Sequence, residues 1–197
     1  DLKRVSLVLK YYYMNIGLYR NGLINALEYG YDELCKPLIE YGIDLETEND
    51  MGQTSLILSI TNNMFDIVQM LVKAGVNVNK SDIFKQSPLM YSICEFRHDI
   101  TRLLLKNGAD KYFQTELGNT PLMIAVNVNN IEAVKILIEY GVDDLLENTY
   151  CNNARDCAVI DSDIYNLLIN TFGAQNKESI WNDTDEEDVI LFEPFFF

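Results

Sequence analysis

The 197-residue sequence has little histidine, cysteine and tryptophan, and few positive charges. It has one histidine, four cysteines and one tryptophan, and its 15 lysines and arginines are outnumbered by 30 aspartates and glutamates. The formal charge of −15 disfavours binding to phosphate backbones and anionic lipid heads. No apolar run approaches the roughly 18 residues that a membrane span requires. We therefore expect neither a nucleic-acid partner nor a membrane partner.

The few catalytic residue types are also poorly arranged for chemistry. The histidine, His98, stands beside Asp99 with no serine or cysteine assignable to it as a nucleophile, so we interpret it as a surface residue. Cys151 and Cys157 fit neither a CxxC nor a zinc pattern. No glycine-rich phosphate loop and no calcium loop is present. The sequence therefore predicts no enzymatic activity, metal, cofactor or small-molecule substrate.

The composition is that of a folded intracellular protein. Hydrophobic residues make up 48% of the chain, which is enough to build a core. No signal peptide follows Asp1, and we expect the four cysteines to stay reduced, as in a reducing compartment. The start at Asp1 rather than Met indicates a fragment of a longer protein. We expect a cytoplasmic location, with the nucleus as the alternative.

What the sequence does contain is a repeat of 33 residues. One glycine column and two leucine columns share this period: Gly42, Gly75, Gly108 and Gly141; Leu23, Leu56, Leu89 and Leu122; and Leu38, Leu71, Leu104 and Leu137. Three columns with one period indicate a stack of similar units.

Each unit is predicted to be a pair of short helices. Residues suited to N-caps precede the first helix, at Asn21, Thr54, Ser87, Thr120 and Asn153. Between the helices stand Gly30, Asn63, Phe96 and Asn129, where a tight turn needs left-handed backbone. Because phenylalanine rarely adopts that conformation, we expect a strained or altered turn at Phe96. An apolar stripe marks the second helix, and the periodic glycine ends it.

These units resemble the ankyrin-repeat family, whose signature is T-P-L-H-x-A. The matching stretches are Thr54-Ser55-Leu56-Ile57, Ser87-Pro88-Leu89-Met90 and Thr120-Pro121-Leu122-Met123-Ile124-Ala125. The resemblance extends from about Gly17 to Gly173. It implies an all-α solenoid of stacked helix-turn-helix units with short hairpin-like loops. One departure is that the family's usual histidine is replaced by Ile24, Ile57, Met90 or Met123, which should remove a hydrogen bond between loops.

The ends of the array are expected to differ from its middle. We predict units at about 17–48, 49–81, 82–114 and 115–147, then a capping unit at 148–173 with Arg155 in the leucine column. Gly173 comes one residue early, which predicts a second helix shortened by one residue. Residues 1–16 are interpreted as an irregular or truncated unit. The tail 174–197 is acidic and then aromatic, and it either docks on the solenoid, belongs to a downstream domain, or is a linear motif for a partner.

Partner binding is predicted at positions that vary between units, at the loop tips and along the first helices. A large apolar residue stands five positions before each column leucine: Leu18, Met51, Phe84, Leu117 and Tyr150. These residues form either an exposed contact stripe or side chains folded back onto the next hairpin. The first helices add Tyr29, Asn62, Glu95 and Val128, and neutral hydrogen bonding is expected from Gln53, Gln86, Asn119 and Asn152. The expected aromatic anchors are Phe84, Tyr112, Phe113 and Tyr150.

Three functions fit this reading of the sequence. The first is an adaptor that binds another protein through the stack. The second is a recognition or targeting module of a longer enzyme or ligase-recruiting protein, because the irregular units look like viral ankyrin proteins, poxvirus ones among them. A ligase-recruiting box is not visible here, and AT-rich genomes of protists or fungi give a similar composition. The third is a structural spacer, for which polar tips would be expected.

Overall fold

Short and longer helices alternate along residues 21–173, the part of the chain that this computed structural model describes. Four helices of seven residues come first in their pairs: α2 (Gly22–Glu28), α4 (Ser55–Thr61), α6 (Pro88–Cys94) and α8 (Pro121–Asn127). Their nine-residue partners are α3 (Asp32–Glu40), α5 (Phe65–Lys73), α7 (His98–Lys106) and α9 (Ile131–Glu139). A ten-residue helix, α10 (Asp163–Phe172), ends the array.

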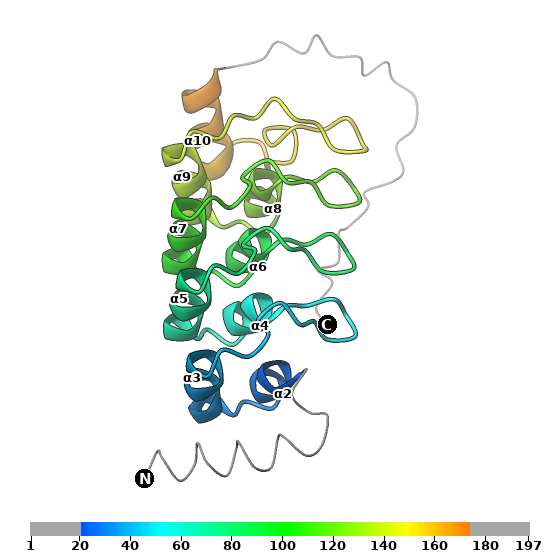
Figure 1. Cartoon of the computed structure of the whole chain (residues 1–197). Helices are drawn as coiled ribbons and strands as arrows, with labels where there is room; N and C mark the ends of the chain where they lie inside the picture. Colours follow the sequence, from blue (N-terminus) through cyan, green and yellow to red (C-terminus); the bar gives the residue numbers. More distant parts are fainter. Residues whose placement is uncertain (1–20, 174–197) are drawn as a thin grey trace.

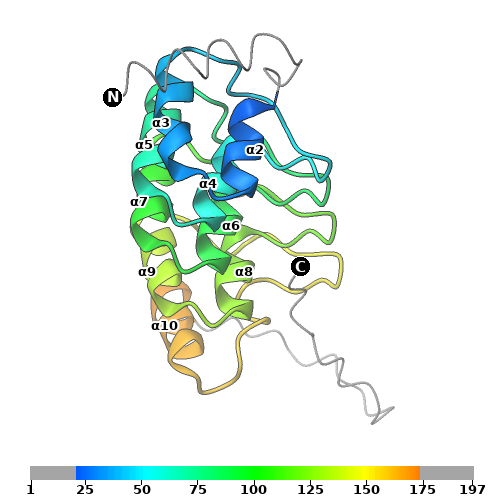
Figure 2. The same cartoon turned by 90° about the horizontal axis from the view of Figure 1, so that it is seen from below.

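The helices form two parallel columns, and the loops between units project from one side. Figure 1 shows the seven-residue helices in one column and the longer helices in the other, with the hairpin-like loops extending past the first column. Figure 2 shows the same arrangement at right angles. Within residues 21–173 the strand-like pairing is limited to one isolated bridge between Glu48 and Thr54. The all-α solenoid is therefore confirmed, and none of the described helices is long and apolar enough to cross a membrane.

The repeated polar residues start the first helices as predicted at three positions. The hydroxyls of Thr54, Ser87 and Thr120 each accept a hydrogen bond of 3.3 Å from the backbone N–H three residues ahead. Asn21 makes no side-chain cap bond. Asn153 accepts from the N–H groups of Arg155 and Asp156, but there it closes a turn rather than a helix.

The turns within the helix pairs are all alike. The backbone φ is +71° at Gly30, +56° at Asn63, +56° at Phe96 and +54° at Asn129. The expected altered turn at Phe96 is therefore wrong, because Phe96 adopts the same left-handed conformation as its counterparts. Because phenylalanine disfavours left-handed backbone, the turn at Phe96 is strained, which was the other outcome expected from the sequence.

The periodic leucines lie in the core between the two columns. Leu23, Leu56, Leu89 and Leu122 are each at most 1% exposed. The residues that replace the family's histidine, Ile24, Ile57, Met90 and Met123, are also at most 1% exposed. This column therefore adds to the apolar core.

The last unit differs from its prediction in two ways. Residues 154–161 form turns instead of a first helix, and α10 is one residue longer than the other second helices, not shorter. The reason is Arg155, which is only 6% exposed and forms an ion pair with the equally buried Asp144. Its Nη1 also donates to the carbonyl of Gly173, just after α10. A buried guanidinium needs such partners, and the turns bring them within reach.

Some predictions lie outside the described residues. These are the irregular unit at 1–16, the tip residue Leu18 and the three alternatives for the tail at 174–197.

Candidate protein-binding surface

Each loop between units ends in a five-residue turn of the same design. The turns span residues 49–53, 82–86, 115–119 and 148–152, and in each the first N–H donates to the fifth carbonyl at 2.9–3.1 Å. The first side chain strengthens the turn: Asn49, Asp82 and Asn148 accept from the third and fifth N–H groups, and Thr115 from the fifth. Short polar side chains favour this geometry because they replace a backbone acceptor. These bonds use the polar backbone groups inside the turn, and the side chain of the third residue projects from the end of the loop.

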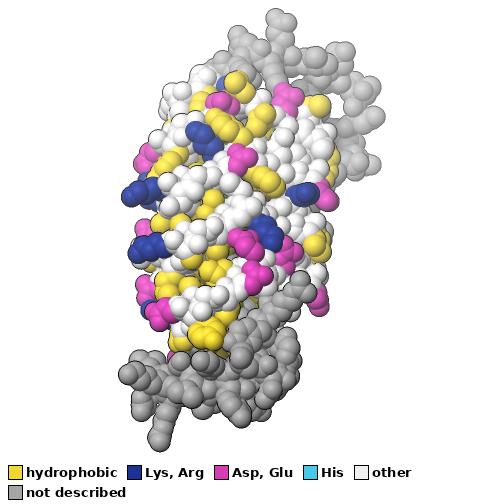
Figure 3. Space-filling model, in the orientation of Figure 1, with side chains coloured by type: hydrophobic (Ala, Val, Ile, Leu, Met, Phe, Trp, Pro, Cys, Tyr) yellow, Lys and Arg dark blue, Asp and Glu magenta, His cyan; other side chains and the backbone are white. Residues whose placement is uncertain are grey.

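The third residues of these turns form what we call the tip row: Met51, Phe84, Leu117 and Tyr150. They are 42%, 52%, 47% and 58% exposed. This exposure favours the contact stripe over the alternative that the side chains fold back onto the next hairpin. The face seen in Figure 3 carries separate groups of apolar side chains with acidic and basic ones between them. The turns that carry the tip row also hold the exposed charged residues Asp50, Lys85 and Glu116.

Neighbouring turns bond to each other at two places. Ile83 N–H donates to Met51 O at 3.2 Å, and Thr149 N–H donates to Leu117 O at 3.0 Å. Glycine makes both approaches possible: a Cβ on Gly52 would lie 3.0 Å from the Ile83 nitrogen, and one on Gly118 would lie 3.0 Å from the Asn148 Cα. The four turns thus form two hydrogen-bonded pairs.

The predicted site residues on the first helices are differently placed. Tyr29 is 71% exposed at the end of α2. Asn62 is exposed, but its amide donates to Leu27 O at 2.8 Å and links two units. Glu95 is half-buried beside Arg97, and Val128 is half-buried against the core. Of the four, Tyr29 offers the most uncommitted surface.

The predicted neutral hydrogen-bonding residues are half-buried, and two of them are engaged inside the molecule. Gln53 Nε2 donates to the Tyr91 hydroxyl at 3.0 Å. Asn119 Oδ1 accepts from Asn148 Nδ2 at 2.9 Å. Gln86 and Asn152 occupy the equivalent fifth turn positions, where their backbone N–H groups close the turns.

The predicted aromatic anchors separate into two kinds. Phe84 and Tyr150 are exposed on the tip row, whereas Tyr112 and Phe113 are half-buried. The Tyr112 hydroxyl lies 3.3 Å from Gly141 O and 3.2 Å from the Asp143 carboxylate, so it joins two units.

Tyr112 belongs to a column of links between units that sequence reasoning missed. Glu46 Oε1 accepts from Asn77 N–H and Asn79 Oδ1 accepts from Asp110 N–H, both at 2.7 Å. Tyr112 repeats the contact 33 residues later, accepting from Asp143 N–H at 3.4 Å. The signal in the sequence was a side chain with an oxygen atom at three positions spaced by 33 residues: Glu46, Asn79 and Tyr112.

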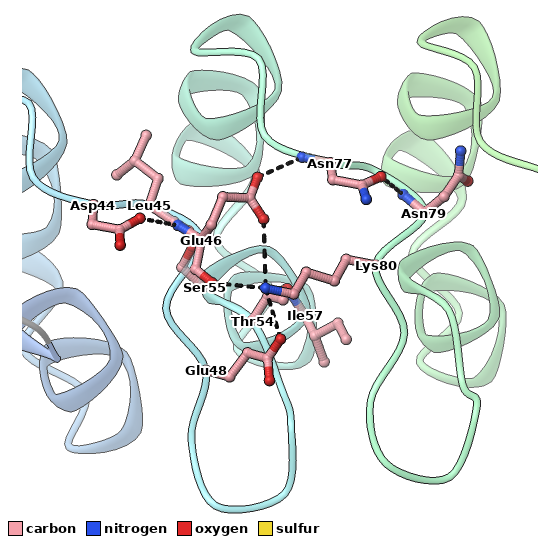
Figure 4. Close-up of polar contacts among 10 residues, drawn as sticks. All are labelled: Asp44, Leu45, Glu46, Glu48, Thr54, Ser55, Ile57, Asn77, Asn79 and Lys80. Carbon is pink, nitrogen blue, oxygen red and sulfur yellow. Dashed lines mark hydrogen bonds and ion pairs between the residues drawn. The ribbon is translucent and has the colours of Figure 1, made fainter.

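Figure 4 shows the first of these links, which a lysine reinforces. Lys80 Nζ donates to the Glu46 carbonyl at 2.8 Å and pairs with the Glu48 carboxylate at 2.7 Å. Within the same close-up, the Ser55 hydroxyl donates to Leu45 O at 2.8 Å. These contacts hold the base of one projecting loop against the next unit.

A polar network supports the turns from beneath. The Tyr91 hydroxyl donates to Asp82 Oδ2 at 2.8 Å and accepts from Gln53, so one side chain of α6 joins two turns. Burial raises the pKa of Tyr91 to about 12; the hydrogen bond from Gln53 opposes this rise, and the Asp82 carboxylate adds to it.

The residues considered for chemistry are used structurally. His98 is half-buried, and its Nε2 lies 2.9 Å from Asn130 Oδ1, so its interpretation as a surface residue is wrong. It joins α7 to the residue that caps α9. Burial raises the pKa of the Cys94 and Cys157 thiols to about 11. Between residues 21 and 173 no three His, Cys, Asp or Glu side chains are grouped to hold a metal ion.

The comparison with known proteins agrees with this geometry. A family model described as ankyrin repeats in three copies matches residues 7–82, 23–115 and 89–179. No curated protein matches the chain. Since the overlapping matches cover most of the sequence and the described helices repeat with the same period, the chain belongs to the ankyrin-repeat family.

Proposed function

We propose that this protein is a non-enzymatic adaptor that binds a partner protein through the tip row and the adjoining end of the first helices. Ankyrin repeats are generally protein–protein interaction modules, and the family match supports this class of function. The observation that carries the proposal is the exposure of all four residues of the tip row on one side of the stack. Rigid turns hold these large apolar side chains in water, so covering them with a partner is favourable and stabilises the complex.

Phe84 and Tyr150 are the residues on which binding should depend most. Aromatic side chains on a rigid backbone offer a large contact area with little entropy loss, and truncating such an anchor typically weakens binding by about 2 kcal/mol or more. The exposed Tyr29 on α2 and the rims of the turns, including Gln86 and Asn152, complete the proposed surface.

We place this activity inside the cell. Cys94, Cys151 and Cys157 are free thiols, as is typical of proteins in a reducing compartment. A spacer would be expected to have polar tips, so the tip row argues against that alternative. The ligase-recruiting and viral interpretations stay predictions from the sequence.

The test compares a tip variant with a matched control. Phe84→Ser with Tyr150→Ser removes two tip aromatics, whereas Tyr41→Ser with Phe65→Ser removes two exposed aromatics from the helix pairs away from the turns. Partners are identified by affinity purification of the wild type, and the affinity of a purified partner is then measured for each variant, with circular dichroism as the folding check. We expect the tip variant to weaken binding at least a hundredfold and the control to change it less than threefold. Equal affinity for the wild type and the tip variant would contradict the proposal.

A further inference from the structure

Lys85 occupies the tip position at which two of the other turns have glycine. The fourth turn residues are Gly52, Lys85, Gly118 and Cys151, and all four have left-handed backbone, with φ of +58° at Lys85. A long side chain disfavours that conformation, which glycine adopts freely. Backbone strain clusters at functional sites, so the strained backbone makes Lys85 a candidate for a functional side chain.

Lys85 also belongs to a turn that has no backbone hydrogen bond to the turn that follows it. A Cβ at Gly52 or Gly118 would come within 3.0 Å of the next turn, and both glycines lie beside a bond between turns. The equivalent position of this turn has Lys85, which carries a Cβ. Among the hydrogen bonds of residues 21–173, none joins Glu116 N–H to Phe84 O, the equivalent pair of groups. These backbone groups are thus left to solvent or to a partner.

The Lys85 ammonium is uncommitted, and exposed apolar residues stand on the same turn and on the next. Lys85 is exposed and forms no ion pair with any residue of the described range 21–173. It is the one lysine or arginine in the four turns. Its own turn carries Ile83 and Phe84, which are 55% and 52% exposed, and the next turn carries Leu117.

The neighbouring charges restrict what could pair with Lys85. Asp50 and Glu116 are exposed on the turns to either side, and Asp82 of the same turn is buried and bonded to Tyr91. A ligand with several carboxylates would meet repulsion from Asp50 and Glu116. A ligand with one carboxylate at Lys85 would not, and such repulsion of wrong ligands is a common source of specificity.

We propose that Lys85 is a specificity-determining residue, whose ammonium pairs with a single carboxylate side chain of the partner. This inference rests on the proposed function and names the partner class: an extended protein segment with one Asp or Glu between two large apolar residues. The apolar residues of the segment contact Phe84 and Leu117, and the carboxylate between them pairs with Lys85. Since the protein as a whole is strongly acidic, the preference arises from this short-range pair rather than from long-range attraction.

The experiment selects ligands from a displayed library of random 12-residue peptides on the purified full chain. The variants are Lys85→Gly, which fits the left-handed backbone and so preserves folding, and Lys85→Glu. The control is Lys135→Glu, which changes an exposed lysine on α9, in the column of longer helices. We expect the wild type and the control to enrich peptides with one acidic residue flanked by large apolar ones. Lys85→Gly should keep the apolar residues and lose the acidic preference, and Lys85→Glu should prefer Lys or Arg there.

Affinities of a synthetic peptide from the wild-type selection provide the measurement. We expect about a tenfold loss of affinity with Lys85→Glu, restored when the acidic residue of the peptide is replaced by lysine. The inference would be overturned if the peptides selected by the wild type shared no acidic residue, or if Lys85→Gly selected the same peptides. Either result would leave the proposed function in place. If the wild type enriches nothing beyond the Phe84→Ser, Tyr150→Ser variant, this inference also fails, whereas the proposed function fails only if that variant binds the purified partner as tightly as the wild type does.

Discussion

A charged side chain in the core column illustrates how single residues shape this protein. Arg155 occupies the column of Leu23, Leu56, Leu89 and Leu122, yet it is almost as buried as they are. Its charge is compensated by Asp144 and by the carbonyl of Gly173. Burying two charges is unfavourable by itself, so the pair stabilises the cap only while both members are present.

A double-mutant cycle tests this dependence. We expect Arg155→Leu and Asp144→Val each to lower the free energy of unfolding by about 3–5 kcal/mol, because each leaves the other charge buried and unpaired. The double variant places in the cap the residues found two units earlier, Val78 and Leu89, and should be more stable than either single variant. Urea unfolding followed by circular dichroism measures all three. Additive losses in the double variant would show that the two charges do not depend on each other.

Tyr91 predicts a specific loss of stability at high pH. Its pKa is raised to about 12 in the folded protein, above the value of about 10 expected when unfolded. The stabilising effect of the neutral phenol is therefore complete below pH 10 and is lost as the pH rises from about 10 to 12. The urea midpoint of the wild type should fall more steeply over this interval than that of Tyr91→Phe. Parallel curves for the two proteins would contradict the assignment.

The repeated element of this fold is the turn at the tip of each projecting loop. Its first side chain, its backbone bond and its left-handed fourth residue recur in all four turns. Gly118 has a second role, because the backbone of Asn148 and Thr149 would lie 3.0–3.1 Å from its Cβ if it had one. Turn conformation and contact between turns therefore depend on the same residue.

Two glycine substitutions separate these roles. Gly75 also has positive φ, but a Cβ there would meet nothing within 4 Å. Gly75→Ala should thus lose about 1–2 kcal/mol from backbone strain alone. Gly118→Ala should lose more, because the turn 148–152 must also move away. Thermal unfolding of both variants gives the comparison, and a larger loss in Gly75→Ala would be the contrary result.

The whole molecule is a one-dimensional stack in which each unit contacts its neighbours. Most of its side-chain links between units join residues 29 to 38 positions apart in the sequence, about one repeat. Stability in such an array is close to a sum of unit and interface contributions, so damage at an end should stay local and damage in the middle should divide the stack.

Hydrogen exchange with mass spectrometry distinguishes these outcomes. Arg155→Leu should increase exchange in residues 144–173 and leave residues 55–127 protected. Leu89→Ala, which opens a cavity at a site 1% exposed and costs about 2–5 kcal/mol, should increase exchange in the units on both sides of α6. A uniform increase along the chain in Arg155→Leu would show that the array unfolds as a single unit.

The sequence by itself determined the features that depend on local structure. A 33-residue period with polar caps, apolar stripes and terminal glycines specifies helix pairs, and it was enough to predict the solenoid and to place a large apolar residue at each loop tip. Each of these follows from hydrogen bonds and burial within one unit, and every unit repeats the same signal.

The tertiary structure decided what happens between units. It showed that the side chains of Tyr112 and Gln53 bond to neighbouring units. It also showed that turns around the buried Arg155 replace a helix in the last unit, and that no backbone bond joins the turn of Lys85 to the next turn. The sequence could not assign these features, because a side chain on one loop meets a group about one repeat away, and which atoms meet depends on how closely the backbones approach. At Gly52 and Gly118 the neighbouring backbone lies so close that an added Cβ would be 3.0 Å from it.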